Sequence, residues 1–117
     1  MEDLEELELS YLSKLENIEM IIENKDKLKI LSLEFCKKIN CFDCIRELIN
    51  LNKLTLCSCG DIPNLKFIKE LKKLNNFVFL DTNIIDGNLS YCLGIDYVAF
   101  TNKKHFSHRE KDFKNSI

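Results

Sequence analysis

The chain has 117 residues, of which 45% are apolar and 31% are charged, and its net charge is −2. This composition supplies enough apolar side chains for one hydrophobic core and argues against wholesale disorder. No run of about 18 uncharged apolar residues is present and no apolar leader follows Met1, so we expect a soluble, cytoplasmic protein. Three glycines and one proline nearly exclude a glycine-rich phosphate loop, and the balanced charge gives no indication of nucleic-acid binding.

Apolar residues recur with a period close to 23 residues, at relative positions 1, 4, 6, 9 and 12 of each unit. The three clearest units are Leu28, Leu31, Leu33, Cys36 and Ile39; Leu51, Leu54, Leu56, Cys59 and Ile62; and Leu74, Phe77, Phe79, Thr82 and Ile85. Two less regular units flank them, namely Leu4, Leu7, Leu9, Leu12 and Leu15 before, and Ile95, Val98, Phe100, Lys103 and Phe106 after. A fixed period of this length indicates stacked, similar units.

Each unit is expected to contribute one short strand, because apolar residues at relative positions 4 and 6 face the same side of an extended chain. Strands are predicted near residues 6–10, 30–34, 53–57, 76–80 and 97–101. Apolar residues three apart, such as Phe42, Ile45 and Leu48, predict helices over 42–49, 64–72 and 12–24. Residues 86–94 predict a turn or a single helical turn. The single domain, 1–117, is divided into units at about 4–27, 28–50, 51–73, 74–94 and 95–106, followed by a short basic tail.

The pattern L-x-x-L-x-L-x-x-[N/C]-x-[x]-L resembles the leucine-rich repeat over roughly residues 4–106. The resemblance implies an α/β fold: a solenoid of about five units with parallel strands on the concave face and helices or turns on the convex face. One unit cannot bury both its strand face and its helix face, whereas a stack of units can.

Six cysteines raise the question of a metal or redox centre. Cys36, Cys41 and Cys44 have the spacing C-x4-C-x2-C, which matches the start of a plant-type iron–sulfur ligand run, and the C-x-x-C pair also suits zinc. The repeat offers another explanation, because Cys36 and Cys59 hold the same position in successive units, where a small side chain packs under the turn after the strand. We therefore expect structural thiols with no metal and no cofactor, with zinc, an iron–sulfur cluster and disulfides as the alternatives.

Other candidate sites are weaker. His105 and His108 are three residues apart, but no acidic residue or cysteine accompanies them at a metal-binding spacing, so we expect them in a packed or surface tail. No nucleophile elbow, phosphate loop or H-E-x-x-H motif is present, so we do not expect an enzyme. Residues 2–27 hold nine acidic side chains against three lysines. The acidic cluster is interpreted as a solvated chain end that also discourages edge pairing at the first strand; it comprises Glu2, Asp3, Glu5, Glu6 and Glu8.

The strand alternation predicts three rows of side chains on the open face of the sheet. The rows are Glu6, Ile30, Lys53, Asn76 and Tyr97; Glu8, Ser32, Thr55, Val78 and Ala99; and Ser10, Glu34, Cys57, Leu80 and Thr101. One end is acidic, and the other is apolar and expected to be exposed at Val78, Leu80, Tyr97 and Ala99, which is typical of a partner site. The alternative is a row of strand-forming residues with no binding role. The candidate partner-binding residues are Glu8, Ser32, Glu34, Lys53, Thr55, Asn76, Val78, Leu80, Tyr97 and Thr101.

A second resemblance concerns residues 74–110. The runs T-N-I-I-D-G-N-L-S from Thr82, Y-V-A-F from Tyr97 and N-K-K-H-F-S-H-R from Asn102 are similar to the ending of small bacterial leucine-rich-repeat immunity proteins, which are encoded beside polymorphic or contact-dependent toxins. The chain departs from that pattern in its short length and in a first repeat without a separate cap. The resemblance implies a cytoplasmic, non-catalytic protein that neutralises a cognate toxin by stoichiometric binding, without nucleic acid or membrane. The alternatives are a scaffold or fragment of a larger leucine-rich-repeat interaction protein, and a cysteine-based metal or redox protein.

Overall fold

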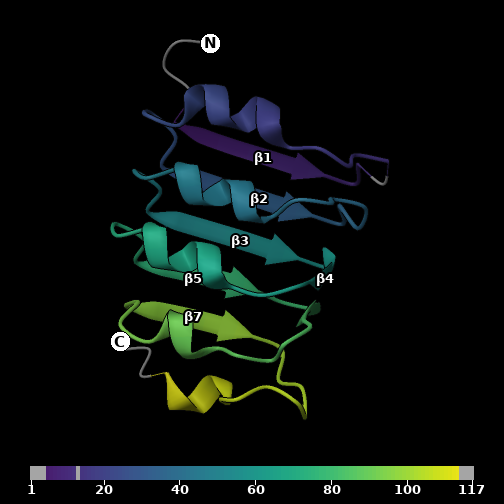
Figure 1. Ribbon diagram of the computed structural model, residues 1–117, viewed down its shortest axis with the longest axis vertical. Helices are drawn as coiled ribbons and strands as arrows, with labels where there is room; N and C mark the ends of the chain where they lie inside the picture. Colours follow the sequence, from purple (N-terminus) through teal and green to yellow (C-terminus); the bar gives the residue numbers. More distant parts are fainter. Residues whose placement is uncertain (1–4, 13, 114–117) are drawn as a thin grey trace.

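Five parallel strands form the main sheet of the computed structural model, which describes residues 5–12 and 14–113 (Figure 1). Their order in the sheet is their order in the chain: β1 (Glu6–Ser10), β2 (Ile30–Glu34), β3 (Lys53–Cys57), β5 (Asn76–Phe79) and β7 (Tyr97–Phe100). The five predicted strands are confirmed, the last two being one residue shorter than expected. A second, small parallel pair that the sequence did not predict joins β4 (Gly60–Ile62) to β6 (Thr82–Ile84). The protein is therefore an α/β fold with a parallel sheet.

Short 3-10 helices cover one face of the sheet, where the sequence predicted longer helices. They are η1 (Glu19–Asn24), η2 (Asp43–Glu47), η3 (Lys66–Glu70) and η4 (Ser90–Cys92). The spacing of the apolar residues explains the difference, because a 3-10 helix has three residues per turn. The amide groups of Ile45, Leu48 and Leu51 each donate to the carbonyl oxygen three residues earlier, at 2.9–3.0 Å. The predicted helix over 12–24 is wrong for residues 12–18, whereas the single turn predicted within 86–94 is confirmed by η4.

The core lies between the sheet and these helices. Equivalent residues of successive units pair directly across the sheet: Leu31 with Leu54, Leu33 with Leu56, and Leu54 with Phe77. All five of these side chains are fully buried. Each unit therefore buries its apolar strand face against its neighbours in the sheet and its own helix, so the stability of one unit depends on the next.

A ladder of side-chain donors joins the turns that follow β2, β3 and β5. Cys36 Sγ donates to Leu9 O at 3.6 Å, and Cys59 Sγ donates to Leu33 O at 3.2 Å. In the following unit Thr82 Oγ1 lies 2.9 Å from Leu56 O. Each donor thus reaches the carbonyl oxygen of the preceding unit's second strand leucine. The predicted equivalence of Cys36 and Cys59 is confirmed, and we call Cys36, Cys59 and Thr82 the turn ladder.

The residue directly after each of β1, β2 and β3, and the second residue after β5, has a positive φ. The residues are Tyr11, Phe35, Ser58 and Asp81, with φ between 50° and 59°. A non-glycine residue in this region is uncommon, and its presence at the same place in four successive units makes it a feature of the repeat. The left-handed residue turns the chain out of the sheet, and this change of direction brings the ladder residue, one position further on, beneath the turn.

Two positions of the repeat differ from the prediction. Ile85 was expected to be buried like Ile39 and Ile62, but its side chain is 57% exposed, whereas Ile84 is fully buried and pairs with Ile62. Gly60, with a φ of +83°, is an extra residue in the turn of the third unit that the fourth unit lacks, so the buried position moves by one. Leu12 is also more exposed than its place in the pattern predicts, at 41%. The unit start at Leu4 lies outside the described residues.

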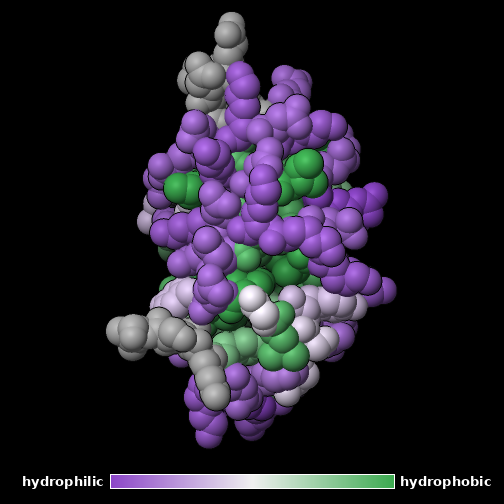
Figure 2. Space-filling view, turned by 90° about the vertical axis from the view of Figure 1, so that its left-hand side faces the viewer, coloured by the Kyte–Doolittle hydropathy of each residue, from purple (hydrophilic) through white to green (hydrophobic). Residues whose placement is uncertain are grey.

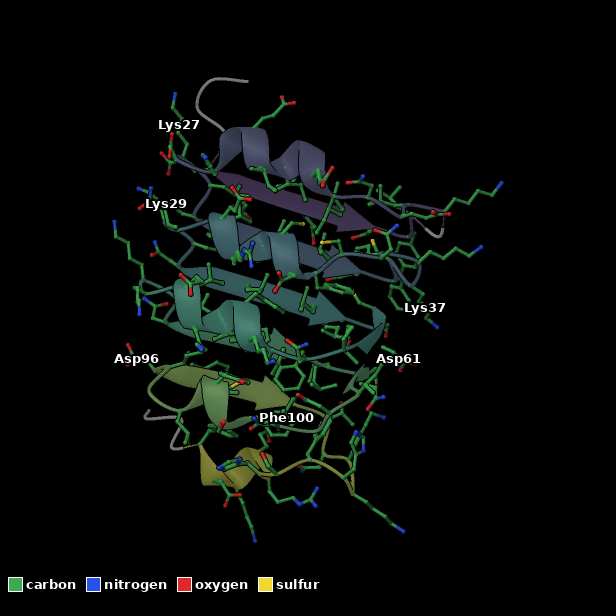
Figure 3. The ribbon with its side chains drawn as sticks, viewed as in Figure 1. Lys27, Lys29, Lys37, Asp61, Asp96 and Phe100 are labelled. Carbon is green, nitrogen blue, oxygen red and sulfur yellow. The ribbon has the colours of Figure 1, made fainter. Side chains whose placement is uncertain are left out.

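The two ends of the sheet differ. The segment predicted only as a basic tail folds over β7: η5 (Glu110–Asp112) follows β7, and a carboxylate oxygen of Glu110 accepts the Phe100 N–H at 3.2 Å. Phe100 points from β7 towards this segment (Figure 3), and its ring lies 5.8 Å from that of Phe106 and 5.6 Å from that of Phe113. At the other end the strand leucines of β1 are only partly buried. The C-terminal end of the core is therefore closed by aromatic side chains, whereas the N-terminal end is not closed within the described residues.

We expect Leu56→Ala to lower the free energy of unfolding by about 2–5 kcal/mol, because it removes a fully buried side chain of the central strand. The measurement is urea denaturation followed by circular dichroism. Thr55→Ala, one residue away on the half-buried face, is the matched control and should change stability by less than about 1 kcal/mol. A loss below about 0.5 kcal/mol for Leu56→Ala would contradict the stacked-unit core.

The turn ladder makes a second expectation. Thr82→Val keeps the shape of the side chain but removes both donations of Oγ1, to Leu56 O and Leu80 O, and leaves the buried Cys59 N–H without its 3.2 Å acceptor. The expected loss of unfolding free energy is about 1–3 kcal/mol. Thr55→Val makes the same chemical change outside the ladder, so equal stabilities of the two variants would show that the ladder contributes nothing.

Candidate partner-binding face

The face of the sheet opposite the helices carries the candidate residues, and we call it the open face. The sheet register confirms the predicted rows: Glu8, Ser32, Thr55, Val78 and Ala99 are successive partners, and so are Glu6, Ile30, Lys53, Asn76 and Tyr97. Ser10, Glu34 and Cys57 begin the third row. Leu80 directly follows β5 and Thr101 directly follows β7. All ten candidate residues thus lie on or directly beside one face, because side chains alternate along every strand.

The N-terminal end of the open face is acidic. Glu6 and Glu8 are exposed on β1, and Glu34 is half-buried at the end of β2. Just before these strands, Lys29 Nζ lies 3.9 Å from a carboxylate oxygen of Glu5, and Figure 3 shows the Lys29 side chain extending away from the sheet. Both side chains of this pair are more than half exposed, so the pair neutralises little of the local charge. Negative potential therefore dominates this end.

The C-terminal end of the open face is apolar. Tyr97 and Leu80 are 41% and 40% exposed, and Val78 is half-buried between them and the centre of the sheet. The expectation that Ala99 is exposed is wrong, since only 8% of it is accessible. Its single methyl group is too short to rise above the longer side chains that flank it on β7 and β5. The apolar patch therefore consists of Tyr97, Leu80 and Val78.

A hollow of about 570 Å³ adjoins Tyr97 where the chain enters β7, and the sequence analysis missed it. It is lined by Leu93, Gly94, Ile95, Asp96, Tyr97, Asp112 and Phe113. Figure 2 shows hydrophobic surface gathered in the lower half of this side of the molecule, whereas hydrophilic side chains cover most of the upper half. Leu93, 55% exposed, breaks the three-residue spacing of Leu89, Cys92 and Ile95, and this was the one available signal in the sequence. The hollow offers an apolar floor and two carboxylates beside an exposed aromatic ring.

One amide on the open face lacks a hydrogen bond. Asn76 lies between Lys53 and Tyr97 in its row, and its Oδ1 atom is buried without a partner among the described residues. Thr101, by contrast, is engaged, because its Oγ1 accepts the Asp81 N–H at 3.1 Å. A free acceptor next to an apolar patch supplies a point at which a partner's donor can be recognised.

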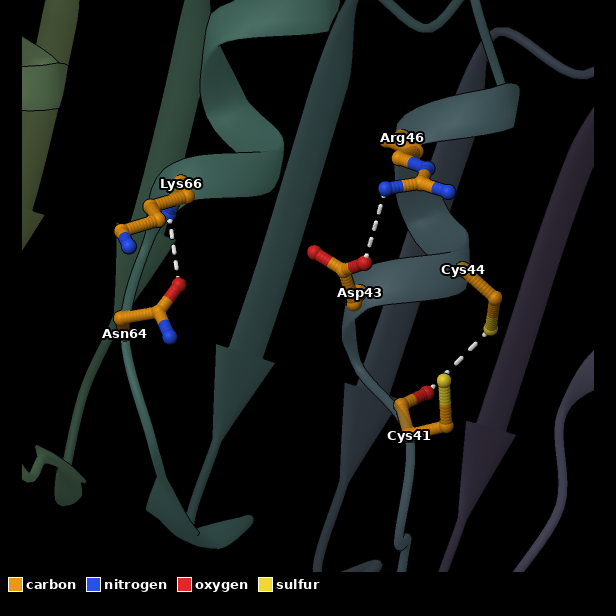
Figure 4. A network of polar contacts seen from close by, with 6 residues as sticks. All are labelled: Cys41, Asp43, Cys44, Arg46, Asn64 and Lys66. Atoms are coloured by element: carbon orange, nitrogen blue, oxygen red, sulfur yellow. Dashed lines mark hydrogen bonds and ion pairs between the residues drawn. The ribbon is translucent and has the colours of Figure 1, made fainter.

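The cysteine cluster is not assembled into a metal site. The turn ladder explains Cys36 and Cys59, while Cys41 and Cys44 lie at the start of η2, where Cys44 Sγ donates to Cys41 O at 3.2 Å (Figure 4). Burial and the neighbouring Cys41 raise the pKa of Cys44 to about 12, which disfavours the thiolate that a metal needs. Among the described residues no group of three or more histidine, cysteine, aspartate or glutamate side chains is placed to hold a metal ion.

The histidines take part in the packing of the C-terminal segment. His105 Nε2 lies 2.9 Å from Ile84 O, and Ser107 Oγ, 2.7 Å from His108 Nδ1, accepts the Leu89 N–H. A Cβ atom on Gly87, whose φ is +69°, would meet His105 O at 2.4 Å, so only glycine fits there. Arg109, considered in the basic tail, donates to the carbonyl oxygens of Lys103 and Lys104. These groups hold the segment in place.

Comparisons with protein-family models, with curated proteins and with solved structures find no match to this chain. Within the described part of the chain, no helix has the length and apolar character needed to cross a membrane. The open face and the hollow beside it are therefore assessed on their own chemistry.

We expect the buried thiols to resist labelling and to destabilise the fold at high pH. Burial raises the pKa of Cys59 to about 11 and that of Cys92 to about 12, above the ordinary value of 9.0. Because unfolded thiols ionise first, their contribution to stability is complete below pH 9 and is lost as the pH rises towards 11–12. The measurements are labelling by Ellman's reagent at pH 8, with and without denaturant, and unfolding at several pH values.

The same preparation should hold no stoichiometric zinc or iron and should melt at an unchanged temperature in chelator. One bound metal per chain, released together with unfolding on chelation, would overturn the structural interpretation of the thiols. Cys92→Ala serves as the control for the alkaline effect and should weaken its pH dependence.

Proposed function

We propose that the chain is a leucine-rich-repeat solenoid that binds a protein partner through its open face, and that this partner is a bacterial toxin domain neutralised by stoichiometric binding. The repeat assignment is supported by the equal register of the units, the 3-10 connections on one face and the turn ladder. In such an array the strand face is the concave one and offers an extended surface.

The observation that carries the binding proposal is the pairing of two different ends on one uncovered face. Tyr97 and Leu80 lie beside a hollow of about 570 Å³ at one end, and Glu6 and Glu8 lie on the first strand at the other. Four inter-strand steps separate β1 from β7, or about 19 Å. An aromatic anchor with a recess beside it supplies most of the energy of a typical interface, and a charged rim steers the partner's approach.

The choice of a toxin rests on the resemblance of residues 74–110 to the ending of immunity proteins. Inhibition by a stoichiometric binder requires only that the bound chain covers the active site of its target. The acidic strand suits a partner with a basic surface, which is common in domains that act on nucleic acids. The direct experiment is to co-express the chain with the product of the neighbouring upstream gene, isolate the complex and assay inhibition.

We expect Tyr97→Ala to weaken toxin binding by about 2 kcal/mol or more, mainly through faster dissociation, because it removes the anchor next to the hollow. Surface plasmon resonance measures both rates. Tyr97→Phe keeps the ring and is the matched control, and urea denaturation checks that both variants fold. Leu80→Ala should weaken binding in the same direction.

Glu34→Lys should act on the association rate instead. Reversing this charge weakens the attraction of a basic partner, so association slows, most visibly at low salt, while dissociation changes little. Glu34→Gln separates loss of charge from reversal. Unchanged binding and unchanged protection of toxin-expressing cells by folded Tyr97→Ala, Leu80→Ala and Glu34→Lys would refute the open-face site.

A further inference from the structure

The outer edge of β1 presents backbone groups that no described strand pairs with. β1 is the terminal strand of the sheet, and its hydrogen bonds to β2 come from alternate residues. The printed contacts fix the phase: Glu5 O accepts the Ile30 N–H at 2.9 Å, and the Tyr11 N–H donates to Glu34 O at 2.9 Å. Odd-numbered residues of β1 therefore face β2, and the N–H and C=O groups of Glu6, Glu8 and Ser10 face outward.

Side chains of opposite character flank this edge. Glu6 and Glu8 project on the open face and are exposed, whereas Leu7 and Leu9 project towards the core and are only partly buried. Beyond the strand, Tyr11, Leu12, Lys14 and Leu15 line a second hollow of about 410 Å³, and Tyr11 is 71% exposed. An added strand would meet carboxylates on one face and incompletely covered leucines on the other.

The opposite edge of the sheet is closed to such pairing. On β7 the Phe100 N–H is taken by the Glu110 carboxylate, and Asn102 Oδ1 accepts the Glu110 N–H at 2.9 Å. This lock, together with the rings of Phe106 and Phe113, occupies the end of the core. Only the β1 edge is left open among the described strands of the main sheet.

The size of the open face also points beyond it. Five strands and five residues per strand span about 24 Å by 16 Å, or about 400 Å². A standard interface takes about 800 Å² from each partner, so the open face supplies about half of one. The β1 edge adjoins its acidic end and extends it.

We propose that the β1 edge binds an extended segment of the protein partner as a sixth strand, in which basic side chains alternate with apolar ones. The inference rests on the proposed function, that the chain binds a protein. The basic side chains lie opposite Glu6 and Glu8, and the apolar side chains cover Leu7 and Leu9. A second copy of this chain does not fit, because antiparallel pairing centred on Glu8 sets this carboxylate against its own copy, and like charges directly opposite are destabilising.

Amide hydrogen exchange tests the open edge without any partner. In the free protein the Glu6, Glu8 and Ser10 amides should exchange at least about tenfold faster than those of Leu7 and Leu9. The probe for the occupant is the peptide acetyl-Lys-Val-Lys-Val-Lys-Val-amide, which should shift and protect the Glu8 and Ser10 amides in NMR spectra with a dissociation constant on the order of 1 mM or tighter. The peptide with Glu in place of Lys should not bind.

Two N-methylated peptides and two protein variants sharpen the test. Because the N–H groups of a strand alternate in direction, methylation at either all lysine or all valine nitrogens should abolish binding, and the other form should retain it. Glu8→Pro and Ser10→Pro remove only outward N–H groups, so both should fold and lose the peptide. Glu8→Thr keeps the N–H group and should bind, with a smaller salt dependence.

The proposal is overturned if the lysine peptide causes no shifts at about 2 mM, if Glu8→Pro and Ser10→Pro bind it as well as wild type, or if the chain dimerises through β1 in sedimentation experiments. Tyr97→Ala should bind the peptide like wild type. Toxin binding without peptide binding would therefore refute the strand and leave the proposed function standing, whereas peptide binding without toxin binding would refute the proposed function alone.

Discussion

The turn after each strand is the place where neighbouring units are joined by a buried side-chain donor. Cys36, Cys59 and Thr82 each reach a carbonyl oxygen of the preceding unit, so their position relative to the strand cannot shift without leaving a buried polar group unpaired. This requirement holds the period constant, and the constant period aligns the strand leucines. Sheet register, core packing and the rows of the open face all follow from it. A thiol and a hydroxyl both serve, because the position needs one small donor and little volume.

The strands and the open face could be predicted from the sequence because both depend on a period of two, which local residues fix by themselves. Leu54 and Leu56 bracket Thr55, and this alone assigns the three side chains to opposite faces. The type of helix was harder. Phe42, Ile45 and Leu48 are compatible with one face of either an α-helix or a 3-10 helix, and the decision comes from the short length of chain that must return to the next strand.

Other features depend on contacts that the local pattern does not contain. The exchange of Ile85 for Ile84 in the core results from Gly60, which lies 24 residues before Ile84. The hollow next to Tyr97 exists because Asp112 and Phe113 fold back beside the start of β7, and the burial of Ala99 reflects the size of its neighbours. Candidate residues were therefore well placed along the strands, while the recess that gives Tyr97 its interest was missed.

The closed C-terminal end and the open N-terminal end give the molecule a direction. Phe79, Phe100, Phe106 and Phe113 form the block that seals the core, and all four come from the last 39 residues of the 117-residue chain. During synthesis the leucine-rich units leave the ribosome first and have no sealed neighbour to pack against. The stable nucleus is therefore completed last, and the first units wait for it with their apolar faces accessible. A cell that makes this chain benefits from chaperone cover during translation, and the need for that cover ends when Phe113 has emerged.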